Sequence, residues 1–157
     1  MQDWSAHSTR PLPALLAEVK EAAVGELHER LGDAGHPDIR PGHGCVFRFI
    51  DAETGSRLTD IAELAQLTKQ AVGEVVADLE RMGYVKRLPD PEDGRAKIIL
   101  LTERGVEAYA TAERLFAEIE REWAEQVGEE LVAALREALE RIAELEREPS
   151  AARRAAA

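Results

Sequence analysis

The clearest pattern of apolar and polar positions lies in residues 58–101. Apolar residues there first recur with the spacing of two amphipathic helices and then follow the pattern of two strands, over residues 60–66, 69–82, 84–88 and 96–101. The second helix has one apolar face, made by Val72, Val75, Val76 and Leu79. Proline, aspartate and glycine in residues 89–94 supply a loop between the strands. Two helices, a short turn between them and a following hairpin predict a winged helix-turn-helix.

Single residues at the ends of these segments support the boundaries. Thr59 and Thr68 each precede a predicted helix, where a hydroxyl can accept a hydrogen bond from an unpaired backbone N–H. Gly83 follows the second helix and favours the left-handed backbone that ends many helices. Gln66 stands in the turn where glycine is common, and we expect it to adopt this conformation. The two helices should approach each other at the small Ala62. Three apolar side chains should hold them across one another: Leu67, Val72 and Val75.

Four further segments have helical spacing, namely residues 12–31, 41–50, 103–126 and 129–146. The long ones carry apolar stripes of Leu12, Leu16, Val19, Ala23, Leu27 and Leu31; of Val106, Tyr109, Phe116, Ile119, Trp123 and Val127; and of Leu131, Leu135, Leu139, Ile142 and Leu145. The short one should bring Val46, Phe47, Phe49 and Ile50 to the core. We expect Thr102 to cap the third segment and residues 56–58 to add a minimal strand to the wing. Residues 1–10 should be frayed, and residues 149–157 should form a flexible tail.

The chain has 157 residues, 4% aromatic residues and one cysteine, which cannot form an internal disulfide. These features predict a single domain over residues 1–157, mainly α with a small antiparallel β wing. We expect a cytoplasmic protein without a membrane partner, because no signal-peptide pattern and no apolar run of about 20 residues is present.

The net charge of −11 argues against DNA binding until its distribution is considered. Residues 57–104 contain 8 basic and 9 acidic residues, so this segment is close to neutral. The remaining negative charge lies in the flanking helical segments. The predicted winged helix can therefore still present a basic face to DNA, with a strong dependence of affinity on salt.

The segment TDIAELAQLTKQAVGEVVADLERMGYVKRLPDPEDGRAK, residues 59–97, resembles the DNA-binding core of the multiple antibiotic resistance regulator (MarR) family of bacterial repressors. Its most specific part is DPEDGRAK, the predicted wing, and the following LTERG also fits. The resemblance implies a winged helix-turn-helix core over residues 57–101, with N- and C-terminal dimerisation helices over residues 12–31 and 103–146. It further implies a bacterial, nucleoid-associated transcriptional repressor that binds double-stranded DNA. We expect a homodimer on a pseudo-palindromic operator, with its recognition helices roughly 34 Å apart.

Ten residues are candidates for the DNA-binding surface: Arg57, Thr68, Lys69, Gln70, Gly73, Lys86, Arg87, Asp93, Arg95 and Lys97. The N-terminal end of a recognition helix enters the major groove, where Gln70 can pair with adenine and Lys69 with guanine or phosphate. Gly73 would allow a close approach to DNA. By resemblance Arg95 enters the minor groove, and Asp93 is expected to hold its guanidinium. Three strand cations are either phosphate contacts or solvated residues: Lys86, Arg87 and Lys97.

The resemblance also implies a small-molecule effector between the dimer helices and the DNA-binding lobe. The candidate ligand-binding residues are His43, Phe47, Arg48 and Tyr109. Cys45 with His36 and His43 could form a metal or redox site, but the H-x-C spacing is weak and such a cysteine is more typical of a core. We predict no metal and no cofactor.

Two other classes of function remain as alternatives. A winged helix can serve as a protein–protein interaction module without binding DNA, and the acidic composition permits this. An enzyme is not predicted, because the sequence has no Ser/His/Asp constellation and no phosphate-binding glycine loop.

Overall fold

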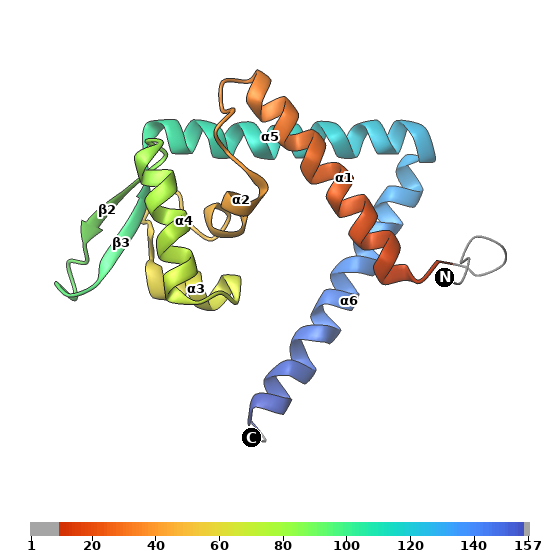
Figure 1. Cartoon of the computed structure of the whole chain (residues 1–157). Coiled ribbons are helices and arrows are strands. Elements are labelled where there is room, and N and C mark those ends of the chain that lie inside the picture. The colour runs from red at the N-terminus through yellow and green to blue at the C-terminus, as the bar shows by residue number, and fades with distance from the viewer. Residues whose placement is uncertain (1–9, 156–157) are drawn as a thin grey trace, which may run out of the picture. The chain divides into compact units, whose positions relative to one another are not determined.

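The computed structural model describes residues 10–155, with their side chains up to residue 146. This part of the chain forms α1 (Leu12–Asp33), α2 (Pro41–Phe47), β1 (Ser56–Arg57), α3 (Leu58–Ala65), α4 (Lys69–Arg81), β2 (Val85–Pro89), β3 (Lys97–Leu101), α5 (Glu103–Val127) and α6 (Glu129–Ala155) (Figure 1). The chain divides into two compact units, Met1–Phe116 and Ala117–Ala157, with the boundary inside α5. The predicted fold class, mainly helical with a small antiparallel sheet, is confirmed. The fraying expected of residues 1–9 lies outside the described residues.

The sheet contains the wing and one added strand. Its three strands are antiparallel in the order β1-β3-β2. β2 and β3 form the wing hairpin, in which Val85 pairs with Leu101, and Figure 1 shows it extending away from α4. β1 lies along the other edge of β3, where Arg57 pairs with Ile98. The minimal strand expected before the first wing helix is therefore present.

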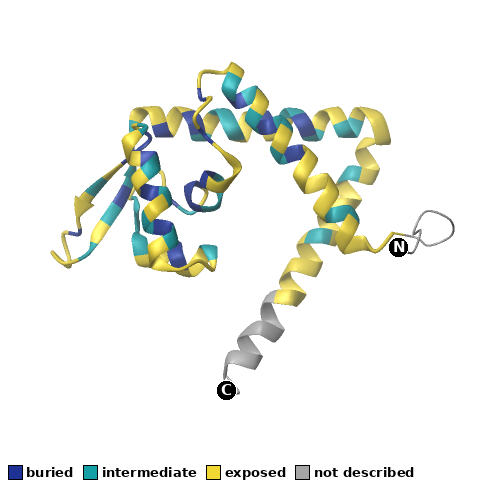
Figure 2. Cartoon of the chain, viewed as in Figure 1, coloured by how far each residue is buried: buried dark blue, intermediate teal, exposed yellow. Residues whose placement is uncertain are grey.

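The apolar face of α4 forms the centre of the first unit. Val72, Val76 and Leu79 are fully buried, and so are Ile61 of α3 and Ile99 of β3. Figure 2 shows buried residues as dark bands along α4 and the sheet. The helical periodicity read from residues 69–82 thus selects the face that packs on the sheet and on α3.

The turn between α3 and α4 has the predicted backbone. Gln66 lies in the left-handed region with φ of 54°. The Thr68 hydroxyl accepts a hydrogen bond from the Ala71 backbone N–H at 3.1 Å. Gly83 ends α4 with φ of 80°. The cap expected from Thr59 was wrong, because α3 already begins at Leu58, and the Thr59 hydroxyl bonds the Asp60 carboxylate instead.

The start of α5 packs closely on the residue that joins α4 to the wing. The Tyr84 carbonyl accepts the backbone N–H of Thr102 at 3.0 Å, while the Thr102 hydroxyl caps α5 by accepting the Gly105 N–H at 3.1 Å. Gly105 is buried against this carbonyl, because a Cβ atom there would overlap the Tyr84 oxygen. Tyr84 is itself fully buried.

The predicted role of Leu67 between the two helices was wrong. Leu67 is 39% exposed, whereas Ile61 and Ala62 of α3 and Val72 and Val76 of α4 are buried. On α5, Ile119 of the expected apolar stripe is buried, together with Gly105, Ala108 and Leu115. Val106 and Phe116 of the same stripe are 45% and 39% exposed in the single chain. The small Gly105 lets the start of α5 approach Tyr84.

Two helix ends also differ from the prediction. α2 ends at Phe47 rather than near residue 50. Three of the four expected core residues, Val46, Phe47 and Ile50, are buried, and Phe49 is half-buried. α6 continues through Pro149 to Ala155, so this proline does not end the helix as expected.

The outer helices carry apolar residues that remain exposed. On α6, Leu131, Leu135, Ile142 and Leu145 are between 43% and 66% exposed. On α1, Leu12 and Val19 are about half exposed, whereas Ala23, Leu27 and Leu31 are buried. Residues 10–155 include no helix with both the length and the apolar character required to cross a membrane.

Candidate DNA-binding surface and adjoining cavity

The N-terminal end of α4 is open to solvent. Thr68, Lys69 and Gln70 are exposed, and the Gln70 amide donates to the Glu74 carboxylate at 3.2 Å. A Cβ atom on Gly73 would meet no atom within 4 Å, so the helix surface is also open at this position. This end of α4 therefore presents a cation, an amide and a bare stretch of backbone together.

The wing tip is a tight turn closed by Asp93. The Asp93 carboxylate accepts the backbone N–H of Arg95 at 3.0 Å, and the Asp93 carbonyl accepts that of Ala96 at 2.9 Å. The expected bond from Asp93 to the Arg95 guanidinium was wrong, since the carboxylate binds the backbone instead. Arg95 is exposed at the tip, and its side chain thus remains available to a partner.

The base of the wing loop is built around a buried carboxylate. Asp90 is 3% exposed. It accepts Arg57 Nε–H at 2.5 Å and the Glu92 backbone N–H at 2.8 Å, while Arg57 Nη2 also donates to the Glu92 carboxylate at 3.1 Å. The Glu92 backbone N–H, and then Arg57, hold the pKa of Asp90 below its ordinary value. Arg57, which sequence reasoning assigned to DNA, is thus bonded within the protein.

The strand cations divide into two groups. The Arg87 guanidinium donates from Nη2 to the Gly73 carbonyl at 3.1 Å, and its Nε lies 3.3 Å from a Glu80 carboxylate oxygen. It therefore ties β2 to α4. Lys86 and Lys97 are both exposed.

Asp90 and Glu80 are functional candidates that the sequence did not reveal. Asp90 lies 33 positions from Arg57 and Glu80 lies 7 positions from Arg87. Neither spacing brings two side chains together within one helix or strand. The nearest available signal was the turn sequence around Pro91, which predicts a loop but not its ionic anchor.

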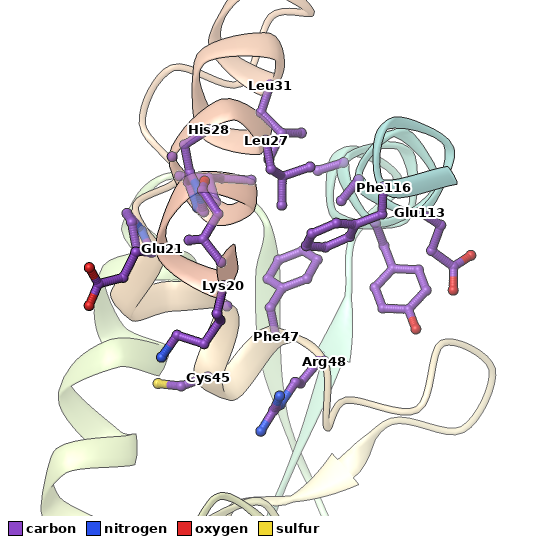
Figure 3. A pocket seen from close by; sticks show the side chains of 18 residues that line it. Lys20, Glu21, Leu27, His28, Leu31, Cys45, Phe47, Arg48, Glu113 and Phe116 are labelled. Atoms are coloured by element: carbon purple, nitrogen blue, oxygen red, sulfur yellow. The ribbon is translucent and has the colours of Figure 1, made fainter. Parts of the chain in front are cut away.

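A cavity of about 800 Å³ opens between α1, α2 and the first half of α5. Three predicted ligand-binding residues line it: Phe47, Arg48 and Tyr109. The Phe47 and Tyr109 rings stack with their centroids 6.3 Å apart. Figure 3 shows the Phe47 and Phe116 rings facing each other in the cavity, with Lys20 and Cys45 at one side.

His43 lies away from the residues that line this cavity. It is buried, its Nδ1 accepts the Arg40 backbone N–H at 3.1 Å, and its Nε2 lies 3.9 Å from the Asp78 carboxylate. Burial lowers its pKa below 6.5, against the smaller opposing effect of Asp78. His43 is therefore a capping residue of α2 that faces α4, and it is not among the residues that line this cavity.

The three residues considered for a metal or redox site have separate environments. His36 is buried with Nδ1 3.2 Å from the Tyr84 hydroxyl, and the Cys45 thiol donates to the Gly42 carbonyl at 2.7 Å. His43 faces α4. Within the described residues no group of three or more His, Cys, Asp or Glu side chains is arranged to hold a metal ion.

Comparison with known proteins agrees with this geometry. The model of the MarR family matches residues 38–96, from the loop before α2 to the wing tip. Residues 38–96 are thus similar to the winged helix-turn-helix of MarR-family proteins. The chain is 33% identical over 76 residues to the transcriptional regulator HosA of Escherichia coli O111:H-, an alignment that covers 48% of this chain and 56% of HosA. The matched segment thus spans about half the length of that relative.

Solved MarR-type structures extend the likeness beyond the winged helix. The reduced form of MarR from Escherichia coli superposes with a TM-score of 0.74 at 22% identity, covering 87% of this chain and 98% of that one. A transcriptional regulator from Thermotoga maritima gives 0.61 at 25% identity, covering 90% and 99%. The MarR-type fold therefore includes the flanking helices as well as the wing.

Proposed function

We propose that this protein is a transcriptional regulator that binds double-stranded DNA, acts as a homodimer and represses transcription until a small molecule binds. The observation that carries the proposal is the exposed N-terminal end of α4, with the wing on the same compact unit. The segment that matches the MarR family, residues 38–96, contains α4 and the wing as far as its tip.

Each element of this surface suits one groove of DNA. Lys69 and Gln70 stand where a recognition helix meets base edges in the major groove. Gly73 leaves room for a phosphate or sugar to approach the backbone. Arg95 at the wing tip has the charge and reach for the minor groove, and Lys86 and Lys97 suit the phosphates beside it.

Exposed apolar residues support the homodimer. Leu131, Leu135, Ile142 and Leu145 recur at helical spacing along α6 and remain solvent-exposed in the single chain. Leaving such a stripe in water costs about 25 cal/mol per Å² of apolar surface, which pairing with a second copy would recover. A two-fold dimer would also present two recognition helices to two half-sites of a pseudo-palindrome.

The cavity supports control by an effector. Its wall includes Phe47, whose ring packs edge-on against Tyr84 at 6.3 Å. Tyr84 directly precedes β2 and hydrogen-bonds the start of α5. A small aromatic or otherwise apolar compound that displaced Phe47 would therefore act on the joint between α4 and the wing.

Selection from a random-sequence DNA library tests the proposal. The protein should enrich a pseudo-palindromic duplex, and affinity for it should fall steeply with salt. Lys69→Ala should weaken binding, whereas Arg81→Ala, which removes a cation from the other end of α4, should not. Failure to enrich any duplex, together with a salt-insensitive protein partner, would favour the interaction-module alternative.

The dimer and the effector require separate measurements. Sedimentation should give a dimer at the concentrations that bind DNA, and a monomer there would contradict the two-fold arrangement. A thermal-shift screen of phenolic and apolar compounds should find ligands that also weaken DNA binding. Hits without any effect on DNA binding would count against effector control.

A further inference from the structure

We propose that Arg57 and Asp90 form a positioning pair that holds the wing in place for DNA, and that Arg57 does not itself contact DNA. This inference rests on the proposed DNA-binding function and assigns these two residues a distinct part in it. The pair lies at the base of the loop that carries Arg95.

The sheet register explains how Arg57 reaches the wing. Arg57 of β1 pairs with Ile98 of β3, which pairs with Leu88 of β2, so the three side chains share one face of the sheet. Asp90 lies two residues beyond Leu88 and continues the ladder, because its backbone N–H donates to the Ala96 carbonyl at 3.1 Å. The Arg57 side chain thus spans β3 to reach the loop from the opposite edge of the sheet.

The rest of the wing loop is bonded mainly to itself. Asp93 accepts backbone N–H groups of Arg95 and Ala96, and Asp90 accepts that of Glu92. Within the described residues, Arg57 makes the ion pairs that join this loop to a residue outside the hairpin. β1 leads directly into α3. Arg57 therefore anchors the wing to the helix-turn-helix.

The contacts of Arg57 make it a poor phosphate ligand. Its Nε and Nη2 groups already donate to Asp90 and Glu92, so two carboxylates offset the charge of one guanidinium. The Asp90 side chain is 1% exposed, so separating the pair would leave a desolvated carboxylate without its cation. Such a pair fixes the position of the wing and adds little to the attraction of DNA.

Removal of the Asp90 charge gives opposite results under the two interpretations. If Arg57 contacts phosphate, Asp90→Asn releases a cation and affinity rises. If the pair positions the wing, Asp90→Asn weakens binding by about tenfold, comparable with the loss of one specific contact. The matched control is Glu63→Gln, which removes an exposed acid of α3 and should leave affinity equal or higher. The probe is the duplex that the wild-type protein selects from random DNA.

A double-mutant cycle between Asp90 and Arg95 separates positioning of the wing from a general loss of stability. If Asp90 acts through the wing tip, Arg95→Ala should cost much less in the Asp90→Asn background than in the wild type. Additive losses would mean that Asp90 does not act through Arg95. Arg57→Lys keeps the charge but loses the two-point donor geometry, so it should weaken binding like Asp90→Asn. Wild-type affinity in Arg57→Lys would overturn the proposal.

Hydrogen exchange tests the anchor without DNA. The backbone N–H groups of Asp90 and Ala96 should exchange severalfold faster in Arg57→Gln and Asp90→Asn, and at the wild-type rate in Glu63→Gln. Unchanged exchange in the first two variants would overturn the proposal. If the wild-type protein selects no duplex, the proposed function fails, while the exchange data still decide whether this pair holds the wing.

Discussion

Replacing Gly105 by alanine tests the packing between α5 and the joint of the wing. Alanine normally stabilises a helix relative to glycine by up to about 1 kcal/mol. At Gly105, however, an added Cβ would overlap the Tyr84 carbonyl oxygen and lie 3.1 Å from the carbonyl carbon and 3.3 Å from Leu101 Cβ. Two effects of opposite sign therefore compete at one position.

The size of the overlap decides whether Gly105→Ala raises or lowers the free energy of unfolding. The obstacle is a backbone carbonyl, which cannot rotate away and which also accepts the Thr102 N–H at 3.0 Å. Overpacking of this kind typically costs about 1–3 kcal/mol, more than the propensity gain in the first turn of a helix. A net loss of about 2 kcal/mol would lower Tm by roughly 4–8 °C for a chain of this size.

Gly25→Ala is the matched control. Gly25 lies inside α1, and a Cβ there would meet no atom within 4 Å. Only the difference in helix propensity remains, so this variant should gain about 0.5–1 kcal/mol of unfolding free energy and about 1–4 °C in Tm. The same substitution in two helices of one protein should thus change stability in opposite directions.

Thermal and urea unfolding followed by far-UV circular dichroism provide the assay. All variants are compared at one protein concentration, because the Tm of a dimer depends on concentration. If Gly105→Ala is as stable as the wild type, the start of α5 does not press on Tyr84 in the way described. The account of the wing joint would then be wrong.

Four further predictions concern single positions. Gly73→Ala should raise Tm by about 2–4 °C, since nothing opposes its Cβ, yet weaken DNA binding measured by fluorescence anisotropy; unchanged affinity would separate Gly73 from the DNA. Thr68→Ala should cost about 1 kcal/mol of unfolding free energy in urea, because the cap on Ala71 N–H is lost; a loss below a few tenths would contradict that cap. Arg95→Ala should weaken binding without unfolding the protein and reduce the slope of log K against log salt by about 0.9 per protomer; an unchanged slope would remove Arg95 from the interface. Because burial lowers the pKa of His43 in the folded state, the unfolded state binds this proton more readily, so stability should fall as pH drops below 6.5; His43→Asn should flatten this part of the profile, and an equal slope in both proteins would exclude His43 as its source.

The order and type of the elements could be predicted because the signals are local. Helical periodicity identified α4 and its buried valines, and capping depends on residues within one turn, as with Thr68 and Gly83. The MarR-type likeness was carried by the wing sequence, whose turn residues are contiguous. Such features need only neighbouring residues and no knowledge of what packs against them.

Tertiary structure decided the use of individual side chains. Arg57 and Arg87 are cations of the kind that contact DNA. Each is instead paired with a carboxylate of the protein, Arg57 with Asp90 and Arg87 with Glu80. The close approach at the start of α5 depends on the Tyr84 carbonyl, which only a residue as small as Gly105 can face. Periodicity identifies a helix but does not rank its faces by the shape of their partners, and charge alone does not distinguish an exposed cation from one paired across a sheet.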